Sequence, residues 1–163
     1  MEIRRIKKED CQKVIELLNE VLEIHAKIRP DIFVSGTTKY LVEDLYKRID
    51  DDKNPIYVAD DNGVVGYAFC MIKEPPFSNN MVYHKEMFID DLCVDSNVRS
   101  SGVGRALFEH VKTEAKKIGC YEVTLNVWEG NDNAIAFYKK MGLKPKEYYM
   151  EYILNDWYLE WFI

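Results

Sequence analysis

The sequence has no excess of basic residues. Its 28 Asp and Glu residues outnumber its 22 Lys and Arg residues, and the formal net charge is −6. Nonspecific binding to nucleic acid depends on a basic surface, so we expect no nucleic-acid partner. An acidic protein is compatible with a cationic substrate, but the sign of the charge alone identifies none.

Long apolar runs are also absent. A membrane-spanning helix needs about 20 consecutive apolar residues, and no stretch of the sequence approaches that length. Residues Met1 to Ile6 carry charges without the apolar run of a signal peptide. We therefore expect no membrane partner and a cytoplasmic location.

The cysteines form no recognisable metal or redox motif. They are scattered, with no CxxC pair and no zinc-ligand spacing, at Cys11, Cys70, Cys93 and Cys120. Free thiols in a reducing compartment are the expected state. His25, His84 and His110 have no second ligand at helical or strand spacing, so we expect no metal site, and surface, loop or packing roles for these histidines.

What is present is the pattern of one α/β domain. A chain of 163 residues with 47% hydrophobic residues can fill a single core. Periodicity and turn residues predict a mixed, mostly antiparallel central sheet flanked by helices, in the order β-α-α-β-β-β-α-β-α-β. The expected strands are Glu2–Ile6, Ile56–Ala59, Val64–Ile72, Glu86–Val94, Glu122–Val127 and Leu143–Leu154. The expected helices run from the cap Asp10 to Arg29-Pro30, then over Tyr40–Ile49, Gly102–Ile118 and Asn133–Met141.

Residues 1–154 are expected to form this domain, and residues 155–163 an aromatic C-terminal tail. The tail contains Trp157, Tyr158, Trp161 and Phe162 and is too apolar to favour full exposure to water. It could pack on its own domain, mediate a homodimer, or be an addition from cloning; the sequence leaves these open.

A Gly-rich turn separates the strand at 86–94 from the helix at 102–118. Small residues in a turn let the backbone approach a ligand closely, and the first turn of a helix presents N–H groups suited to phosphate. Neither a Walker loop nor a dinucleotide fingerprint fits the glycine spacing. The alternative is a tightly packed turn that binds nothing. Its residues are Arg99, Ser100, Ser101, Gly102, Val103, Gly104 and Arg105.

The run from Asp91 to Leu107 resembles the acetyl-CoA signature of the GNAT acetyltransferase superfamily. That signature has Gln or Arg, two variable residues, Gly, one variable residue, and Gly or Ala; Arg99, Gly102 and Gly104 match it. The resemblance implies acetyl-CoA as co-substrate and no metal. It also implies that the backbone from Arg99 to Arg105 holds the pyrophosphate, and that the strand residues Leu92, Cys93 and Val94 pair with the pantetheine arm.

A second segment, Asn131 to Leu143, resembles another GNAT pattern, N-x-x-A-x-x-(F/L)-Y-x-x-x-G-(F/L). Asn131 fits a helix cap and a cofactor contact, and Gly142 fits a left-handed helix end. The resemblance implies that the hydroxyl of Tyr138 lies near the CoA sulfur, where it protonates or hydrogen-bonds the departing thiolate. The alternative is a core tyrosine with a satisfied hydroxyl.

The general base is expected on the strand at 86–94. Its run Asp90-Asp91-Leu92-Cys93-Val94 resembles the E-D-F-F-V strand of diamine acetyltransferases, in which the glutamate is the proposed base. Asp90 holds that position, and because aspartate is shorter, a water relay is favoured. Regular alternation predicts that Asp90 shares a face with Leu92 and Val94 while Asp91 points away. Glu86 is the reserve candidate, and an exposed or salt-bridged carboxylate is the alternative for each.

Taken together, these motifs predict an acetyl-CoA-dependent N-acetyltransferase that moves the acetyl group directly to a primary amine. Acidic residues expected near the acceptor cleft favour a small cationic molecule: Glu43, Asp44, Glu86 and Asp90. Two alternatives stay open, a protein N-terminal or lysine acetyltransferase and a non-catalytic CoA-binding sensor. In GNAT folds the connection after the first helix overhangs the acceptor cleft, so the resemblance implies that Asp31 or Phe33 could touch substrate; a purely structural loop is the alternative.

Overall fold

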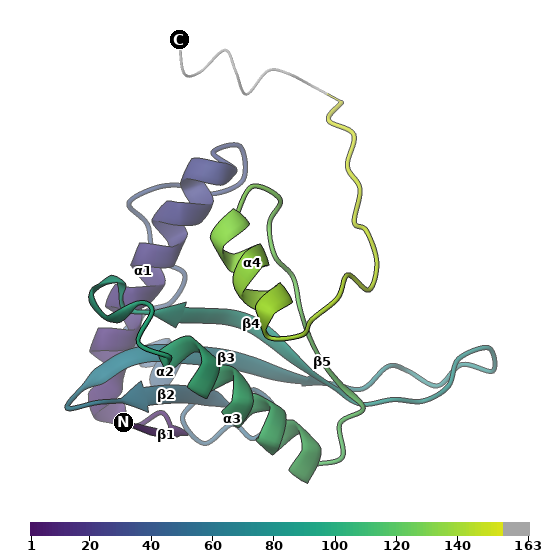
Figure 1. The fold of residues 1–163 in the computed structure, drawn as a ribbon, viewed down its shortest axis with the longest axis horizontal. Helices are drawn as coiled ribbons and strands as arrows, with labels where there is room; N and C mark the ends of the chain where they lie inside the picture. The colour runs from purple at the N-terminus through teal and green to yellow at the C-terminus, as the bar shows by residue number, and fades with distance from the viewer. Residues whose placement is uncertain (155–163) are drawn as a thin grey trace.

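A single twisted sheet forms the centre of the computed structural model, which describes residues 1–154 (Figure 1). Neighbouring strands follow chain order, and every pair is antiparallel except β4 and β5, which are parallel. The strands are β1 (Glu2–Arg5), β2 (Ile56–Asp60), β3 (Val64–Lys73), β4 (Glu86–Val94) and β5 (Glu122–Leu125). This architecture confirms the predicted mixed sheet within one α/β domain.

Two helices cover opposite faces of the sheet. On one face, Val14 and Leu17 of α1 pack with Tyr67 and Phe69 of β3. On the other face, Leu107 of α3 belongs to a second core with alternate residues of β3 and β4. The helices are α1 (Cys11–Ile28), α2 (Val42–Tyr46), α3 (Val103–Lys117) and α4 (Asp132–Lys140), with short 3-10 turns at η1 (Lys8–Asp10) and η2 (Ser96–Val98).

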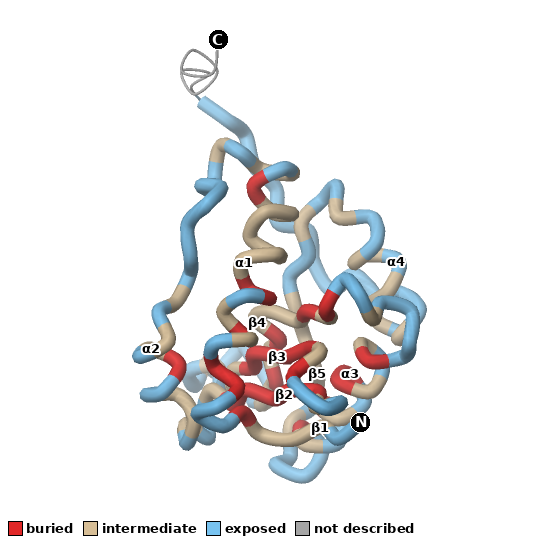
Figure 2. The backbone as a smooth tube through the Cα atoms, turned by 90° about the vertical axis from the view of Figure 1, so that its left-hand side faces the viewer, coloured by how far each residue is buried: buried red, intermediate tan, exposed pale blue. Residues whose placement is uncertain are grey.

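The fourth helix differs from the others because no residue of α4 is fully buried. Figure 2 shows the buried positions concentrated along the sheet and on α1 and α3, whereas α4 is coloured as intermediate and exposed. Asn131 caps α4 by accepting a hydrogen bond from the Ala134 amide, as expected. Gly142, just past the helix, has a φ of 92°, which confirms the predicted left-handed helix end.

The predicted helix ends differ from the observed ones in several details. Asp10 occupies the N-cap position of α1, as predicted, but its carboxylate makes no cap bond to that helix and accepts from the Lys7 amide instead. The second helix covers Val42–Tyr46 rather than Tyr40–Ile49, and Leu41 is exposed because it precedes the helix. Ile118, expected to face inward, is also exposed because α3 ends at Lys117.

The predicted strand at Leu143–Leu154 is absent from the structure. Residues 144–154 form no regular element and are exposed, including Tyr148, Tyr149 and Tyr152. The adjoining edge strand β5 ends at Leu125, so it offers a short edge for pairing. Ion pairs to the body of the protein join Lys146 to Glu122 and Glu151 to Arg29. The tail at 155–163, for which a role was left open, lies outside the described residues.

No helix among residues 1–154 is both long enough and apolar enough to cross a membrane. The four cysteines are free thiols, as predicted, and three of them are buried.

Candidate active site

A cleft opens where β4 and β5 separate. The parallel pairing runs from Glu86 opposite Glu122 to Ile89 opposite Leu125 and stops there. Beyond this point β4 continues to Val94 along β3, whereas the chain after Leu125 leaves the sheet and enters α4. The second half of β4 therefore keeps a strand partner on its β3 side, while its other side faces the gap below α4 (Figure 1).

The cleft has a volume of about 3420 Å³, well above the roughly 300–1,000 Å³ of ordinary small-ligand pockets. It therefore offers room for an elongated ligand together with a second molecule. Almost all the residues expected to bind acetyl-CoA line it: Leu92, Cys93, Val94, Arg99, Ser100, Gly102, Val103, Gly104, Arg105, Asn131 and Tyr138. Ser101 does not, because its hydroxyl donates to the Val98 carbonyl within the loop.

A β-bulge in β4 changes which side chains face the cleft. Phe69 of β3 is opposite Asp91, but the next residue, Cys70, is opposite Ile89, so Asp90 is the extra residue of the bulge. Residues opposite one another in a sheet share a face. Asp91 thus lies on the α1 side with Phe69, while Ile89 and Leu92 lie on the α3 side.

The prediction that Asp90 shares a face with Leu92 and Val94 is therefore wrong. Regular alternation would have put Asp90 on the α3 face, but the inserted residue shifts the alternation by one position. Asp90 and Asp91 both project on the α1 side of β4. Both carboxylates line the cleft, although regular alternation would have placed them on opposite faces.

Asp91 has the most perturbed carboxyl group in the cleft. Burial raises its pKa to about 6; the nearby Asp90 charge adds to this, whereas the Lys39 ammonium opposes it. A carboxylate with this pKa is mostly ionised at pH 7 yet accepts a proton more readily than an exposed aspartate. Asp91 points away from Leu92 and Val94, as predicted, but the base was expected on the opposite face, so sequence reasoning missed Asp91 as a candidate.

Two tyrosines accompany Asp91: Tyr67 is fully buried and Tyr138 is partly buried. Burial, followed by the charge of Asp91, holds the pKa of both Tyr67 and Tyr138 well above the ordinary tyrosine value. Both hydroxyls therefore stay protonated and act as hydrogen-bond donors. Tyr67 lies close to Asp91, but their geometry falls short of a regular hydrogen bond, and its hydroxyl has no other partner among residues 1–154. A buried unpaired hydroxyl is unusual and is consistent with a site that binds a polar ligand.

Asp90 is engaged by a lysine from the connection between α1 and α2. The Lys39 Nζ donates to Asp90 Oδ2 at 2.8 Å. Burial opposes the charge of Lys39, but the bond to Asp90 and the charges of Asp90 and Asp91 leave its pKa raised. The structure thus brings an ammonium group and two carboxylates together on the α1 side of the bulge.

The Gly-rich turn has the shape of an anion-binding loop. Ser100 and Gly102 both have left-handed backbone conformations, with φ values of 70° and 91°. Gly102 stands at the N-cap of α3 without a side-chain cap, so the first-turn amides are left for a ligand. A Cβ at Gly102 would meet nothing within 4 Å. These features fit the pyrophosphate of CoA.

Gly104 is needed for a different reason. A Cβ there would lie 3.2 Å from the Phe137 ring of α4. The glycine thus lets α3 and α4 approach closely, and α4 carries Tyr138 one residue further along the chain. The second glycine of the signature is a packing requirement that positions the tyrosine.

The loop is anchored to α1 by a charged pair. Asp95 accepts from the Asn97 amide at 3.0 Å, and Lys13 lies 2.9 Å from its second oxygen. The Asn97 amide, and then Lys13, hold the pKa of Asp95 below its usual value. Asp95 is 7% exposed, so this pair fixes the start of the turn against α1.

Aromatic side chains line the opposite end of the cleft. Phe33 packs against His25 at 5.2 Å and edge-on to Trp128 at 5.5 Å, measured between ring centroids. Arg29 lies over Trp128 and pairs with Asp31 at 2.6 Å. Of the candidates in this connection, Phe33 lines the cleft and Asp31 does not. His25 does line it, although a surface or loop role was expected.

Other acidic residues are placed less favourably than predicted. Glu43 and Asp44 on α2 do not line the cleft. Glu86 does, but it accepts from Thr124 and lies near Lys146 in the half of β4 that pairs with β5. His84, Glu86 and Glu122 converge; Lys146 lies 2.5 Å from Glu122 and supplies the positive charge between the two glutamates.

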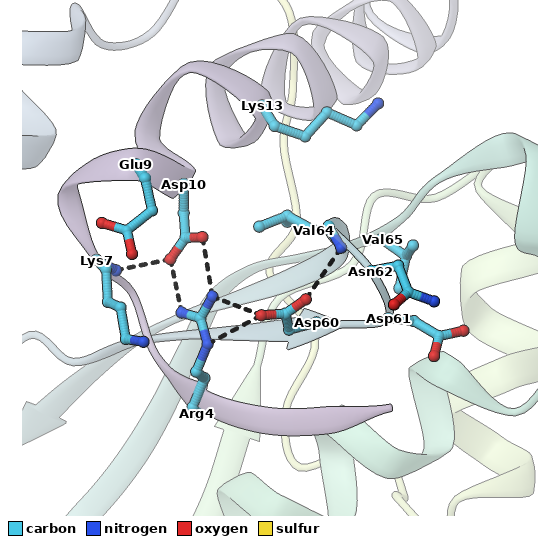
Figure 3. A pocket seen from close by; sticks show the side chains of 11 residues that line it. Arg4, Lys7, Glu9, Asp10, Lys13, Asp60, Asp61, Asn62, Val64 and Val65 are labelled. Carbon is cyan, nitrogen blue, oxygen red and sulfur yellow. Dashed lines mark hydrogen bonds and ion pairs between the residues drawn. The ribbon is translucent and has the colours of Figure 1, made fainter.

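A second, smaller pocket of about 610 Å³ lies between the N-terminal strand and the start of α1 (Figure 3). The Arg4 guanidinium donates to Asp10 at 2.7 Å and to Asp60 at 2.8 Å. These bonds raise the pKa of Arg4, and its side chain is largely covered. Because both carboxylates are satisfied by Arg4, the cluster tethers β1, β2 and the start of α1.

Comparisons with known proteins agree with the fold and the cleft. The family model for the acetyltransferase (GNAT) family matches residues 18–143. The glucosamine 6-phosphate N-acetyltransferase of Trypanosoma brucei brucei is 26% identical over 149 residues, which are 90% of this chain and 91% of that protein. The BH1408 protein from Bacillus halodurans, solved in a mutant form, has a TM-score of 0.90 at 30% identity and covers 95% of this chain and 100% of its own.

A shorter match has higher identity. The peptidyl-lysine N-acetyltransferase YjaB of Escherichia coli is 46% identical over 56 residues, or 34% of this chain. The aligned part is about a third, 35%, of that relative's length. The family model covers most of the chain, including the Gly-rich turn and α4. The chain therefore belongs to the GNAT acetyltransferase family, and it is an N-acetyltransferase of a family that uses acetyl-CoA as co-substrate.

Proposed function

We propose that this protein transfers the acetyl group of acetyl-CoA directly to a primary amine in the cleft between β4 and α4. The observation that carries the proposal is the bulge at Asp90, which puts the carboxylates of Asp90 and Asp91 together on the α1 side of β4, where both line the cleft. On this proposal, the amides of the Gly-rich turn hold the pyrophosphate, and the strand Leu92–Val94 pairs with the pantetheine arm. Asn131 borders the same channel.

Asp91 acts as the general base, in place of the expected Asp90. It takes a proton from the acceptor ammonium, directly or through one water, and the free amine attacks the thioester carbonyl carbon. Moving a proton from an alkylammonium with pKa near 10.4 to a group with pKa about 6 is uphill by roughly 6 kcal/mol. That fits within the barrier of about 16 kcal/mol that corresponds to ten turnovers per second.

Tyr138 stabilises the departing CoA thiolate by donating a hydrogen bond. A thiolate with pKa near 8.5 is a weaker base than a tyrosinate, and the pKa of Tyr138 is raised further by burial. Full proton transfer from Tyr138 to the sulfur is therefore unfavourable, whereas a hydrogen bond in a buried site is effective. The predicted proximity of Tyr138 to the sulfur is retained in this proposal, with the role of donor rather than acid.

The acceptor is proposed to be a small cationic amine. Asp90 and Asp91 supply negative charge to the cleft, whose lining also includes the rings of Phe33 and Trp128. A cationic amine would gain from both the carboxylates and the ring faces. The breadth of the cleft also supports a lysine side chain of a protein as a second candidate.

The test is acetyl-CoA-dependent thiol release with a panel of acceptors. The panel contains polyamines, an aminoglycoside, glucosamine 6-phosphate and lysine peptides, each compared with acetyl-CoA and protein alone. We expect the highest kcat/KM with a small cationic amine. Preference for peptides would move the proposal to a protein acceptor. Binding of acetyl-CoA without acetylated product from any acceptor would support the CoA-binding sensor instead.

A further inference from the structure

Lys39 places a primary amine of the protein itself inside the cleft. It belongs to the connection between α1 and α2, which reaches β4 through the contact of Lys39 with Asp90. Its Nζ lies 2.8 Å from Asp90 Oδ2, its side chain is 47% exposed, and it lines the same cleft as Tyr138. Its ammonium is thus held on the cleft side of the bulge rather than in bulk water.

The groups that an acceptor amine requires already surround Lys39. Its charge interacts with the carboxylates of both Asp90 and Asp91. Asp90 anchors the ammonium, and Asp91 is the buried carboxylate assigned above as general base. The proposed function needs a primary amine beside Asp90 and Asp91 in the cleft, and Lys39 of the folded chain supplies one.

We infer that Lys39 is a self-acetylation site, modified by acetyl-CoA bound in the protein's own cleft. This inference rests on the proposed function. Nζ loses one proton to Asp91 and attacks the acetyl carbonyl carbon, so that an N–C bond forms, and the nitrogen then releases a second proton to solvent. The C–S bond breaks, CoA leaves as the thiolate, and the thiolate takes up a proton from solvent. The products are Nε-acetyl-Lys39 and free CoA, and no other reactant is needed.

The modification changes the charge of the cleft. An acetylated lysine has no ammonium, so the ion pair with Asp90 is lost. The freed Asp90 carboxylate can then bind the ammonium of an external amine. Self-acetylation therefore converts a cleft whose negative charge is neutralised by Lys39 into one that attracts cations. Because the bond to Asp90 favours the charged form of Lys39, the reaction is slow relative to turnover and proceeds when no external acceptor is bound.

The experiment is peptide-level mass spectrometry of the full chain incubated with acetyl-CoA and no acceptor. Lys47 is the matched internal control, because it is also paired with an aspartate, Asp44, yet its side chain is 76% exposed and it does not line the cleft. Spontaneous acetylation favours the exposed Lys47. We expect Lys39 to gain an acetyl group at least tenfold faster than Lys47, at a rate independent of protein concentration.

Two further arms tie the labelling to the cleft. Excess CoA, which competes for the donor site, is expected to slow labelling of Lys39 at least tenfold and leave Lys47 unchanged. Asp91→Asn is expected to lower the Lys39 rate to that of Lys47. Labelling of Lys39 no faster than Lys47, or labelling insensitive to both CoA and Asp91→Asn, overturns the inference.

The outcome also separates this inference from the proposed function. If external amines are acetylated but Lys39 is labelled no faster than Lys47 in the incubation without an acceptor, the proposed function stands and the self-acetylation site is rejected. If acetyl-CoA neither binds nor reacts with any amine, both are rejected. Lys39→Arg serves as the assignment control, since it removes the modified residue and keeps a positive charge beside Asp90.

Discussion

The two halves of β4 have the same backbone conformation and very different surroundings. Residues Glu86–Ile89 have strand partners on both sides, β3 and β5. Past the bulge, the second half of the strand pairs with β3, and its other side faces the cleft. In the paired half, the Glu86 carboxylate accepts a hydrogen bond from Thr124 and lies near the Lys146 ammonium. The open half exposes Asp91 to the gap beneath α4, and we propose that the chemistry occurs there.

The largest effect, a loss of acetyl-CoA affinity, is expected from a substitution in the Gly-rich turn that follows the open half of β4. Gly102→Asp introduces a negative charge at the phosphate position and a side chain at a φ of 91°. We expect acetyl-CoA affinity to fall at least about a hundredfold. A thermal-shift titration checks this, because bound ligand at a hundredfold excess over Kd stabilises the fold by about 2.7 kcal/mol.

Gly119→Asp is the matched control for that variant. Gly119 follows the other end of α3, has a φ of 75°, and also has open space around its Cβ position. The left-handed backbone strain of about 1–2 kcal/mol is thus similar in both variants. Equal loss of acetyl-CoA binding in the two variants would mean that strain in α3, rather than charge at the turn, is responsible.

Removing the Tyr138 hydroxyl tests the donor that faces the open half. Tyr138→Phe is expected to lower kcat by roughly 10²-fold, since a preorganised buried donor to a developing charge is lost. Affinity for acetyl-CoA should stay nearly unchanged. Steady-state kinetics and a binding titration check both values, and Tyr121→Phe, at an exposed tyrosine, serves as the control. A kcat within about threefold of the parent would leave the hydroxyl with a structural role.

The buried carboxylate should have a measurable effect on stability. The folded-state pKa of Asp91, about 6, is above its ordinary 3.8, so the folded protein binds that proton more tightly than the unfolded chain. This contribution to stability is present below about pH 4 and is lost as pH rises through 6. At pH 7 the charged group destabilises the fold by roughly 3 kcal/mol at most.

Asp91→Asn should therefore raise Tm by several degrees at pH 7 and change it little at pH 4, although it lowers activity. Glu86→Gln, in the paired half of β4, is the comparison, and it should lower Tm because it weakens the contacts with Thr124 and Lys146. Thermal denaturation at the two pH values is the measurement. A lower Tm for Asp91→Asn at pH 7 contradicts the desolvation argument.

A smaller effect on acetyl-CoA affinity is expected from the Lys13–Asp95 pair that anchors the turn to α1. Lys13→Met keeps the aliphatic stem and removes the charge that lies 2.9 Å from Asp95. Partly exposed ion pairs contribute about 1 kcal/mol or less, so acetyl-CoA affinity should weaken by about threefold or less. Lys112→Met removes a similar pair with Glu109 on the outer side of α3. Calorimetric titration of both variants should show weakening for Lys13→Met alone.

The order of β1 to β5 and the four helices could be predicted from sequence because those segments bury regular apolar patterns. The turn was predicted because its glycines have a specific backbone requirement, as Gly102 confirms. The strand at Leu143–Leu154 was predicted from the same kind of pattern and is absent, because pairing depends on an available edge rather than on the segment itself.

The facing of Asp90 was predicted wrongly because alternation was extended through the bulge. The sequence does contain a signal for the bulge. Met87 and Ile89 face the α3 core, and the next residues to do so are Leu92 and Val94, so the period of two slips by one residue between Ile89 and Leu92. The position of Lys39 had no comparable signal, because its contact with Asp90 joins residues 51 positions apart through an irregular connection.

The most direct test of the account is the pH dependence of kcat/KM for a primary amine in the parent protein, Asp90→Asn and Asp91→Asn. The parent should rise with pH and level off above about pH 6, where Asp91 is ionised. Asp90→Asn should keep that break, and Asp91→Asn should lose it and fall by roughly 10²-fold or more near pH 7. If Asp90→Asn removes the break while Asp91→Asn retains both the break and the rate, Asp91 is not the base and the central claim is contradicted.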